Sequence, residues 1–243
     1  MTAALSPAHH RRLRQIWRSA GWPCQDMLEV ELLHAGLLQR LRDAAGRETL
    51  RVTDAGVAVL AQTLQSHRAA RDAHESLVDR VARDMQRAGR IVWRGLSLRA
   101  RVGDGDAAGW AMAMPDVYSI RHTTVEAYLE PLVHEIKVTR ADLLSDLRHE
   151  AKRAAYLALS SECWYVIRQG IAQPQEIPPD SGVLVASEAG LEVARPAPKR
   201  SMQMSFGLWM ALARATPVDN GPDQEAQAWL GGTDTDADAA PPT

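Results

Sequence analysis

The chain has 243 residues, of which 46% are hydrophobic and 24% are charged, a composition typical of a globular protein with one large domain or two small ones. No apolar run approaches the roughly 18 to 20 residues that a membrane helix needs, and no secretory signal is visible near the N-terminus. We therefore expect no membrane partner. Two widely separated cysteines exclude a cysteine-rich metal site and favour a reduced, cytoplasmic protein.

The formal net charge of −2 is the sum of two unlike parts. Residues 215–243 contain six acidic residues and no basic one, so the preceding residues carry 28 basic and 24 acidic side chains, a balance of +4. This balance leaves a nucleic-acid partner open, which the total charge alone would discourage. Residues 216–243 are rich in Asp, Gly, Pro and Thr, and we expect them to form a disordered acidic tail.

Residues 1–66 are expected to form a small domain of helices and one β hairpin. Apolar spacing predicts two helices, then strands at 37–43 and 49–53, and Thr53 or Asp54 caps a further helix. This order resembles the winged helix-turn-helix domains of bacterial regulators, which implies DNA binding. The resemblance is incomplete, because that fold normally has three helices before the hairpin. A helical packing or dimerisation domain is the alternative, and a homodimer stays open.

Residues 67–200 are expected to form an α/β core, with a mixed central sheet flanked by helices. Residues 67–89 are predicted to be one amphipathic helix, separate from the helix before it. A first strand is predicted at 90–99 and a loop at 100–113. Further elements are strands at 114–120, 132–138, 163–167, 182–186 and 191–194, a helical stretch after residue 139, and a last helix within 201–215.

The two strands at 114–120 and 132–138 bring charged residues into apolar surroundings. Alternation along the second strand places Glu135 and Lys137 on one face and His134 on the other. Asp116, at the start of the first strand, is close enough to reach the same point. Because charges in a core strand are costly unless they are paired or bind a ligand, these residues predict either a functional site or a half-exposed ion pair on an edge strand.

Pro115-Asp116, followed 19 positions later by Glu135-Ile136-Lys137, resembles the signature of the PD-(D/E)xK nuclease superfamily. The resemblance implies a restriction-endonuclease-like fold in which Asp116, Glu135 and the carbonyl of Ile136 hold Mg²⁺ or Mn²⁺. It also implies that Lys137 orients or activates the attacking water. The chemistry agrees with these residue types, because Mg²⁺ takes oxygen ligands, lowers the pKa of water and neutralises charge on a phosphate.

Two further features of the resemblance lie on neighbouring helices. Lys152 and Tyr156, with Arg148 preceding them at the same spacing, lie on one predicted helix face. The pair matches the Gln or Lys followed by Tyr of RecB-like members, which implies a catalytic role. Many relatives carry a glutamate on the helix before the first core strand, and Glu75 is the candidate for this additional metal ligand. The alternative for Lys152 and Tyr156 is a basic stripe exposed to solvent, and the alternative for Glu75 is a favourable contact with the helix dipole.

A narrower similarity concerns the run Val133–Asp142, Tyr156 and residues 182–185, which looks like the MmcB-type DNA-repair endonucleases. This similarity implies DNA as the substrate and a role in DNA repair. We therefore expect a DNA endonuclease that depends on Mg²⁺ or Mn²⁺. One alternative is a non-catalytic winged-helix DNA-binding regulator with a degenerate nuclease scaffold. Another is a structural protein in which the charged residues form only an ion pair.

Overall fold

The computed structural model describes residues 5–19, 21–103 and 108–219. They belong to two compact units, unit 1 (Met1–Asp72) and unit 2 (Ala73–Thr243), each with its own hydrophobic core. The boundary between the units lies inside one long helix, α3 (Asp54–Arg87). Within the described ranges, no helix has the length and apolar character needed to span a membrane.

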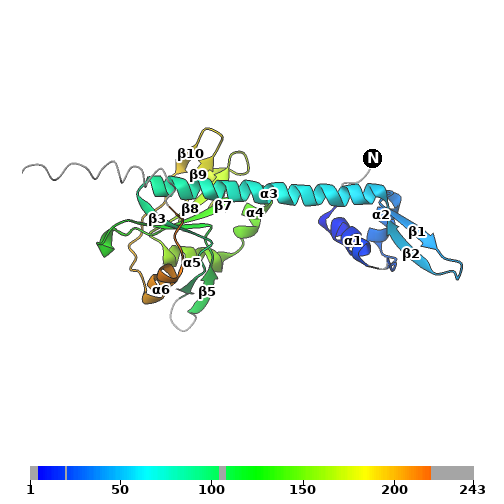
Figure 1. Ribbon diagram of the computed structural model, residues 1–243, viewed down its shortest axis with the longest axis horizontal. Coiled ribbons are helices and arrows are strands. Elements are labelled where there is room, and N and C mark those ends of the chain that lie inside the picture. Colours follow the sequence, from blue (N-terminus) through cyan, green and yellow to red (C-terminus); the bar gives the residue numbers. More distant parts are fainter. Residues whose placement is uncertain (1–4, 20, 104–107, 220–243) are drawn as a thin grey trace, which may run out of the picture. The chain divides into compact units, whose positions relative to one another are not determined.

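Unit 1 consists of two helices and a two-stranded antiparallel hairpin, followed by the first part of α3 (Figure 1). Ser6 and Asp26 cap the two helices, each through a side-chain oxygen that accepts a backbone N–H. The elements are α1 (Pro7–Arg18), α2 (Met27–His34), β1 (Leu38–Arg42) and β2 (Glu48–Val52). The predicted helices and hairpin are confirmed, whereas a winged-helix fold stays a prediction.

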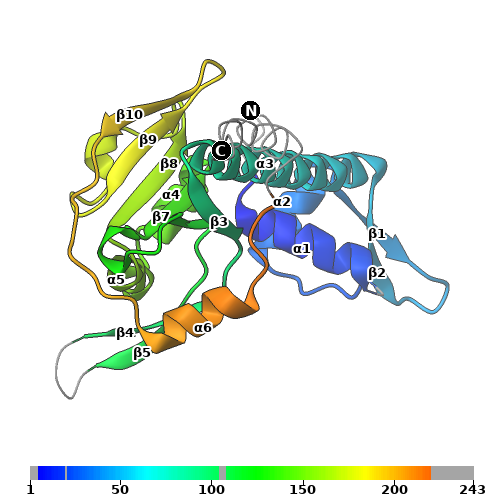
Figure 2. The same cartoon turned by 60° about the vertical axis from the view of Figure 1, so that its left-hand side comes forward.

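A six-stranded mixed sheet forms the centre of unit 2 (Figures 1 and 2). Across the sheet the order is β10-β9-β8-β7-β6-β3, in which β7, β8 and β9 run parallel and the other strands run antiparallel to their neighbours. The α/β class with a mixed central sheet is therefore confirmed. The strands are β3 (Arg90–Arg94), β6 (Val117–Arg121), β7 (Leu132–Lys137), β8 (Glu162–Arg168), β9 (Gly182–Ala186) and β10 (Leu191–Arg195).

Helices cover both faces of this sheet (Figure 2). On one face, the C-terminal part of α3 packs Leu77, Val78 and Val81 against the central strands. On the other face lie α4 (Arg140–Asp146) and α5 (Glu150–Leu159), which connect β7 to β8. Because both faces are covered, any polar side chain in the middle strands must find its partners within the protein.

A two-stranded antiparallel ribbon packs on α5. It consists of β4 (Leu98–Val102) and β5 (Gly109–Ala113). The inner side chains of the ribbon, among them Leu98 and Ala100, join the same core as α5 and the last helix, α6 (Phe206–Arg214). Figure 2 shows α6 alongside the ribbon. The helix predicted within residues 201–215 is confirmed.

The helix predicted at residues 67–89 is wrong in one respect, because it is not separate from the helix before it. A single helix, α3, runs from Asp54 to Arg87 through position 66. Glycine and proline are absent between Val57 and Ala88, so nothing in the sequence breaks the helix there. The left-handed backbone of Gly89, with a φ of 74°, ends it.

The strand predicted at 90–99 and the loop predicted at 100–113 are corrected by the structure. Gly95 has a φ of 58°, in the left-handed region, and separates β3 from β4, which enter different sheets. Residues 100–113 contain most of the ribbon rather than a loop. The sequence alternates a buried Ala100 with an exposed Arg101, but the glycines and aspartates that follow made the whole segment look like a loop. Residues 104–107 lie outside the described residues.

Part of the predicted disordered tail is ordered. The Val218 N–H donates to the carbonyl of Val92 in β3 at 2.8 Å, and the side-chain amide of Gln86 donates to the Val218 carbonyl at 3.0 Å. Residues 216–219 are therefore attached to unit 2. The remainder of the predicted tail, residues 220–243, lies outside the described residues.

A pH dependence of stability follows from His134, which is buried in β7 with no hydrogen-bond partner for Nδ1 among the described residues. Burial lowers the pKa of this ring to about 3. The unfolded chain takes up a proton below about pH 6.5 that the folded protein does not. Stability should therefore fall between about pH 6.5 and about pH 3, by at most about 1.4 kcal/mol per pH unit from this group.

Denaturant unfolding across this pH range measures the effect. His134→Leu should remove this share of the slope, because leucine has no proton to take up. Equal slopes in the wild type and the variant would contradict the prediction.

Candidate active site

The junction of β6 and β7 holds the first predicted site residue, Asp116. The antiparallel ladder ends one pair before it, so Asp116 is next in register, opposite Glu135. Pro115 has no N–H and cannot extend the ladder. Instead, the Asp116 Oδ2 accepts the backbone N–H of Ile136 at 2.7 Å. This hydrogen bond fixes the Asp116 carboxylate at the strand edge beside Glu135.

The Glu135 carboxylate is buried, with 3% of its side chain exposed, and both of its oxygens accept hydrogen bonds. Its Oε1 accepts from the Nζ of Lys137 and from the Nζ of Lys152, each at 2.7 Å. Its Oε2 lies 2.8 Å from the hydroxyl of Tyr156, which donates to it. Lys137 lies two residues after Glu135 on the same face of β7, whereas Lys152 and Tyr156 belong to α5. Glu135 is thus surrounded by donors from two elements.

A second buried carboxylate, Asp146 of α4, completes the cluster. It accepts from the Nζ of Lys152 at 2.5 Å and from the hydroxyl of Tyr165 at 2.9 Å. The Nζ of Lys137 lies 3.5 Å from it. Glu135, Asp146 and the two lysines therefore form a group of two negative and two positive charges, which we call the charge cluster. Each buried charge in it has an opposite partner, as burial requires.

The charge cluster sets the protonation of its lysines. Burial lowers the pKa of Lys137, but the charge and hydrogen bond of Glu135, together with the charges of Asp146 and Asp142, raise it above its ordinary value. The pKa of Lys152 is raised for similar reasons. Burial and the charge of Asp116 raise the pKa of Glu135, against the effect of the two lysines. Both lysines therefore stay charged at neutral pH and are suited to stabilising anions rather than to accepting protons.

His74 of α3 lies on the other side of Asp116. Its Nε2 is 3.4 Å from the Asp116 Oδ2, and this contact raises the pKa of His74 despite the opposing effect of burial. Glu75 does not share this position. Its carboxylate contacts Arg94 at 2.8 Å and the His74 Nδ1 at 3.5 Å, and 56% of its side chain is exposed. The position of Glu75 therefore does not support the predicted role as a metal ligand.

The oxygen donors at the strand edge fit a small, hard cation. The carboxylates of Asp116 and Glu135 are close enough that the first raises the pKa of the second. The carbonyl of Ile136 points the same way as its N–H, toward Asp116, as in any extended strand. In the described part of the chain, no three His, Cys, Asp or Glu side chains gather to hold a metal. Mg²⁺ does not require three, because waters and phosphate complete its shell.

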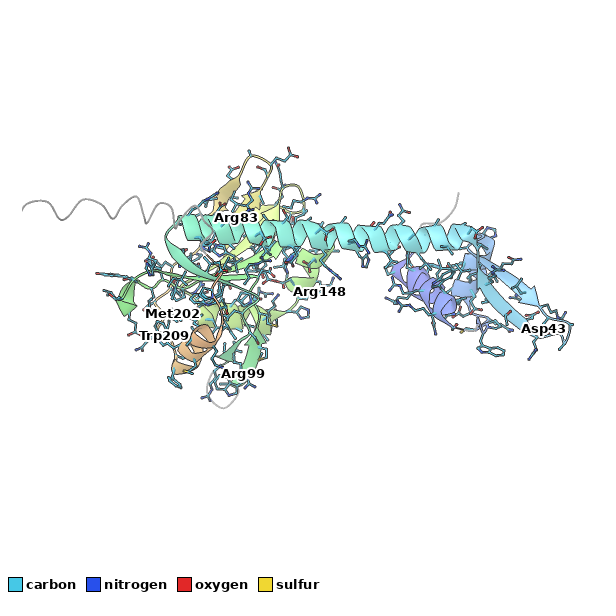
Figure 3. The ribbon with its side chains drawn as sticks, in the orientation of Figure 1. Asp43, Arg83, Arg99, Arg148, Met202 and Trp209 are labelled. Atoms are coloured by element: carbon cyan, nitrogen blue, oxygen red, sulfur yellow. The ribbon has the colours of Figure 1, made fainter. Side chains whose placement is uncertain are left out.

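The structure brings together all the residues predicted as catalytic, Asp116, Glu135, Lys137, Lys152 and Tyr156, on one side of the sheet. Arg148 does not share their helix face, because α5 begins only at Glu150. Its side chain lies exposed in the turn before α5 (Figure 3). Of the three residues predicted on one helix face, only Lys152 and Tyr156 share it.

Three residues of this region were missed by sequence reasoning: Asp146, Tyr165 and His74. Parallel pairing of β7 and β8 places Tyr165 beside Glu135, so a correct pairing of these two strands would have found it. His74 lies next to Asp116, at the place where the resemblance implied a ligand from its neighbour Glu75. No local pattern distinguishes Asp146 from other helical acids.

No family model and no curated protein matches this chain. Among solved structures, it is similar to the SPO1766 protein of unknown function from Silicibacter pomeroyi, with a TM-score of 0.39 and 18% sequence identity. The match covers 62% of this chain and 84% of that chain. At this level the likeness carries no argument about fold or function.

The charge cluster predicts a pH-dependent effect of Asp146→Asn. The variant removes a charge that offsets the ammonium groups of Lys137 and Lys152, so the free energy of unfolding at pH 7 should fall by about 3 kcal/mol. Burial raises the pKa of Asp146, but the hydrogen bonds from Lys152 and Tyr165 and the charges of the two lysines together lower it to below its ordinary value. The stability that the carboxylate adds is therefore present above about pH 4 and is lost as the pH falls further.

Urea unfolding of both proteins at neutral and acid pH measures this difference. Tyr165→Phe removes only the hydroxyl that donates to Asp146, so it should cost less, about 1.5 kcal/mol. A difference between the wild type and Asp146→Asn that does not change with pH would contradict the prediction.

Proposed function

We propose that this protein is a metal-dependent DNA endonuclease and that unit 2 is a PD-(D/E)xK nuclease core. The observation that carries the proposal is the hydrogen bond from the N–H of Ile136 to Asp116. Ile136 is the residue between Glu135 and Lys137 in the chain. It joins the two halves of the sequence motif in space. A sheet with parallel central strands and helices on both faces is compatible with a restriction-endonuclease-like core.

The chemistry proposed is hydrolysis of a phosphodiester by water, with no covalent intermediate. Mg²⁺ or Mn²⁺, held by Asp116, Glu135 and the Ile136 carbonyl, would supply charge for the scissile phosphate and lower the pKa of the attacking water. Lys137 remains charged and stabilises negative charge that develops beside Glu135. Lys152 has 30% of its side chain exposed, and it would bind a phosphate oxygen of the substrate from the solvent side of the charge cluster.

Tyr156 is proposed as a positioning residue. Its hydroxyl lies 2.8 Å from the Glu135 Oε2, which fixes the orientation of the carboxylate. Its ring also lies under Lys152, with Nζ 5.3 Å from the ring centroid. The side chain therefore holds two of the proposed catalytic groups in place without reaching the substrate.

DNA is the proposed partner, repair or processing of DNA the proposed setting, and the cytoplasm the proposed location. Unit 1 would assist as a winged-helix-like domain. Arg11 and Arg18 of α1 are exposed and are candidates for phosphate contacts. Arg12 is not, because its guanidinium pairs with Asp26 at 2.7 Å and with Glu29 at 3.2 Å.

A structural role for the charge cluster is the main alternative. It is favoured by one observation, that Glu135 and Asp146 are already neutralised by Lys137 and Lys152. A DNA-binding regulator with a degenerate scaffold, or a protein that only uses these ion pairs for stability, would need no divalent cation. Cation binding therefore separates these alternatives from the nuclease.

The first test is cleavage of supercoiled plasmid, linear duplex, single-stranded and branched DNA with Mg²⁺ or Mn²⁺. Asp116→Ala and Lys137→Ala should each reduce the rate by about a hundredfold or more, because each removes charge at the reacting phosphate. Asp84→Ala, at a partly exposed acid on α3 that pairs with Arg87, is the matched control and should cut at the wild-type rate.

Circular dichroism checks that the variants fold. Wild-type rates in Asp116→Ala would show that the site is wrongly assigned. A wild-type protein that cuts none of these substrates would overturn the proposed function.

The second test is calorimetric titration with Mn²⁺, in the absence of DNA. We expect saturable binding by the wild type and none by Asp116→Asn, because the variant keeps the shape of the side chain but loses a charged oxygen donor. The same titration of Asp84→Ala should match the wild type. Identical titrations of the wild type and Asp116→Asn would favour the structural alternative.

A further inference from the structure

The outer face of the β4–β5 ribbon combines guanidinium groups with exposed apolar side chains. Arg99 pairs with Met112, and Arg101 pairs with Trp110, across the two strands. Residues directly opposite one another share one face of a ribbon, so these four side chains lie on the same face. Trp110 exposes 72% of its surface, while the alternate residues of both strands pack inward.

The helix α6 adds a second wall. Phe206, Met210 and Arg214 follow one another at four-residue steps and so lie on one helix face. Phe206 is 80% exposed. With Arg99 and Trp110 they line a groove of about 790 Å³, which we call the ribbon groove. Its size is in the range of sites that bind ligands as large as a nucleotide base.

The ribbon groove and the adjoining outer face of the ribbon carry uncompensated positive charge. Arg99, Arg101 and Arg214 form no ion pair or side-chain hydrogen bond with any described residue. Arg94 and Arg140, by contrast, are neutralised by carboxylates: Arg94 pairs with Glu75 and Arg140 with Glu176. Acidic residues are absent from the described lining of the groove. Its chemistry is therefore complementary to an anion with apolar, stackable parts.

We infer that the ribbon groove binds single-stranded DNA, with bases stacked on Trp110 and Phe206 and phosphates paired with the three arginines. Bases of a single strand are free to stack on aromatic side chains, whereas a duplex keeps its bases enclosed. A second copy of this chain that presented the same face would also cover the exposed rings, but it would bring arginines against arginines. The uncompensated charge thus favours a polyanion as the occupant.

One strand of the ribbon connects the ribbon groove to the candidate active site along the chain. The strand β5 ends at Ala113, and the next residue, Met114, has its carbonyl 3.0 Å from the Tyr156 hydroxyl. That hydroxyl also contacts Glu135, and Asp116 follows two residues later. We therefore expect a strand held along β5 to run toward the proposed site. The inference rests on the proposed function and narrows its substrate to DNA with a single-stranded segment.

Binding measured without divalent cations tests the groove independently of cleavage. We would titrate the full chain into a fluorescent oligonucleotide of about 16 nucleotides and into its duplex, and follow anisotropy. The wild type should bind the single strand about tenfold tighter than the duplex. Trp110→Ala and Phe206→Ala should each weaken single-strand binding by about five- to a hundredfold, the loss expected for one stacked base.

Arg99→Gln and Arg214→Gln should each reduce the slope of log K against log salt concentration by about 0.7, as expected for one phosphate contact on a single strand. Two matched controls should bind as the wild type does: Tyr128→Ala, a 64% exposed aromatic outside the groove, and Arg83→Gln, an exposed arginine of α3. Figure 3 shows Arg83 on the opposite side of unit 2 from Arg99 and Trp209.

Wild-type binding by the groove variants would overturn the inference. So would a change of oligomeric state in Trp110→Ala, seen by sedimentation, with unchanged DNA binding, because the groove would then be a self-association surface. If the groove variants bind normally while Asp116→Ala abolishes cleavage, the groove fails and the proposed nuclease stands. If the groove binds a single strand but no DNA is cut, the proposed function fails and the groove stands.

Discussion

Glu135 carries a carboxylate in the middle of a sheet that helices cover on both faces, and an ionised group there requires donors from its surroundings. Lys137 is supplied by the strand itself, and Lys152 and Tyr156 by α5. Two ammonium groups around one carboxylate leave an excess of positive charge, which Asp146 of α4 offsets. The positions of α4 and α5 over β7 are therefore tied to one buried carboxylate.

The same arrangement limits the chemistry that the site can perform. The lysines are held charged, so proton transfer through them is disfavoured, and their use lies in fixed positive potential. Access is also limited, because the side chains of Glu135 and Lys137 are almost fully buried while Asp116 and Lys152 remain partly exposed. A substrate would therefore meet the cluster at the edge that these two exposed residues form.

The parts of the candidate site that depend on local pattern could be predicted from the sequence. Alternation in β7 separates Glu135 from His134, and a four-residue step links Lys152 to Tyr156, so both pairs follow from the geometry of one element. Asp146 could not be found in this way, since its role depends on how α4 and α5 pack on β7. The position of Glu75 has a related reason: adjacent helical residues point about 100° apart, and the helix turns His74, not Glu75, toward Asp116.

The ribbon escaped prediction because its hairpin turn is rich in glycine and aspartate, which masked two short alternating strands. Its recognition changes how the segment before the site is understood. Met114 and Pro115 connect an exposed strand carrying Trp110 to the carboxylate of Asp116, and the Tyr156 hydroxyl contacts both this connection and Glu135. The ribbon and the first carboxylate of the candidate site are therefore joined by two residues of backbone, and the Tyr156 hydroxyl attaches this connection to Glu135.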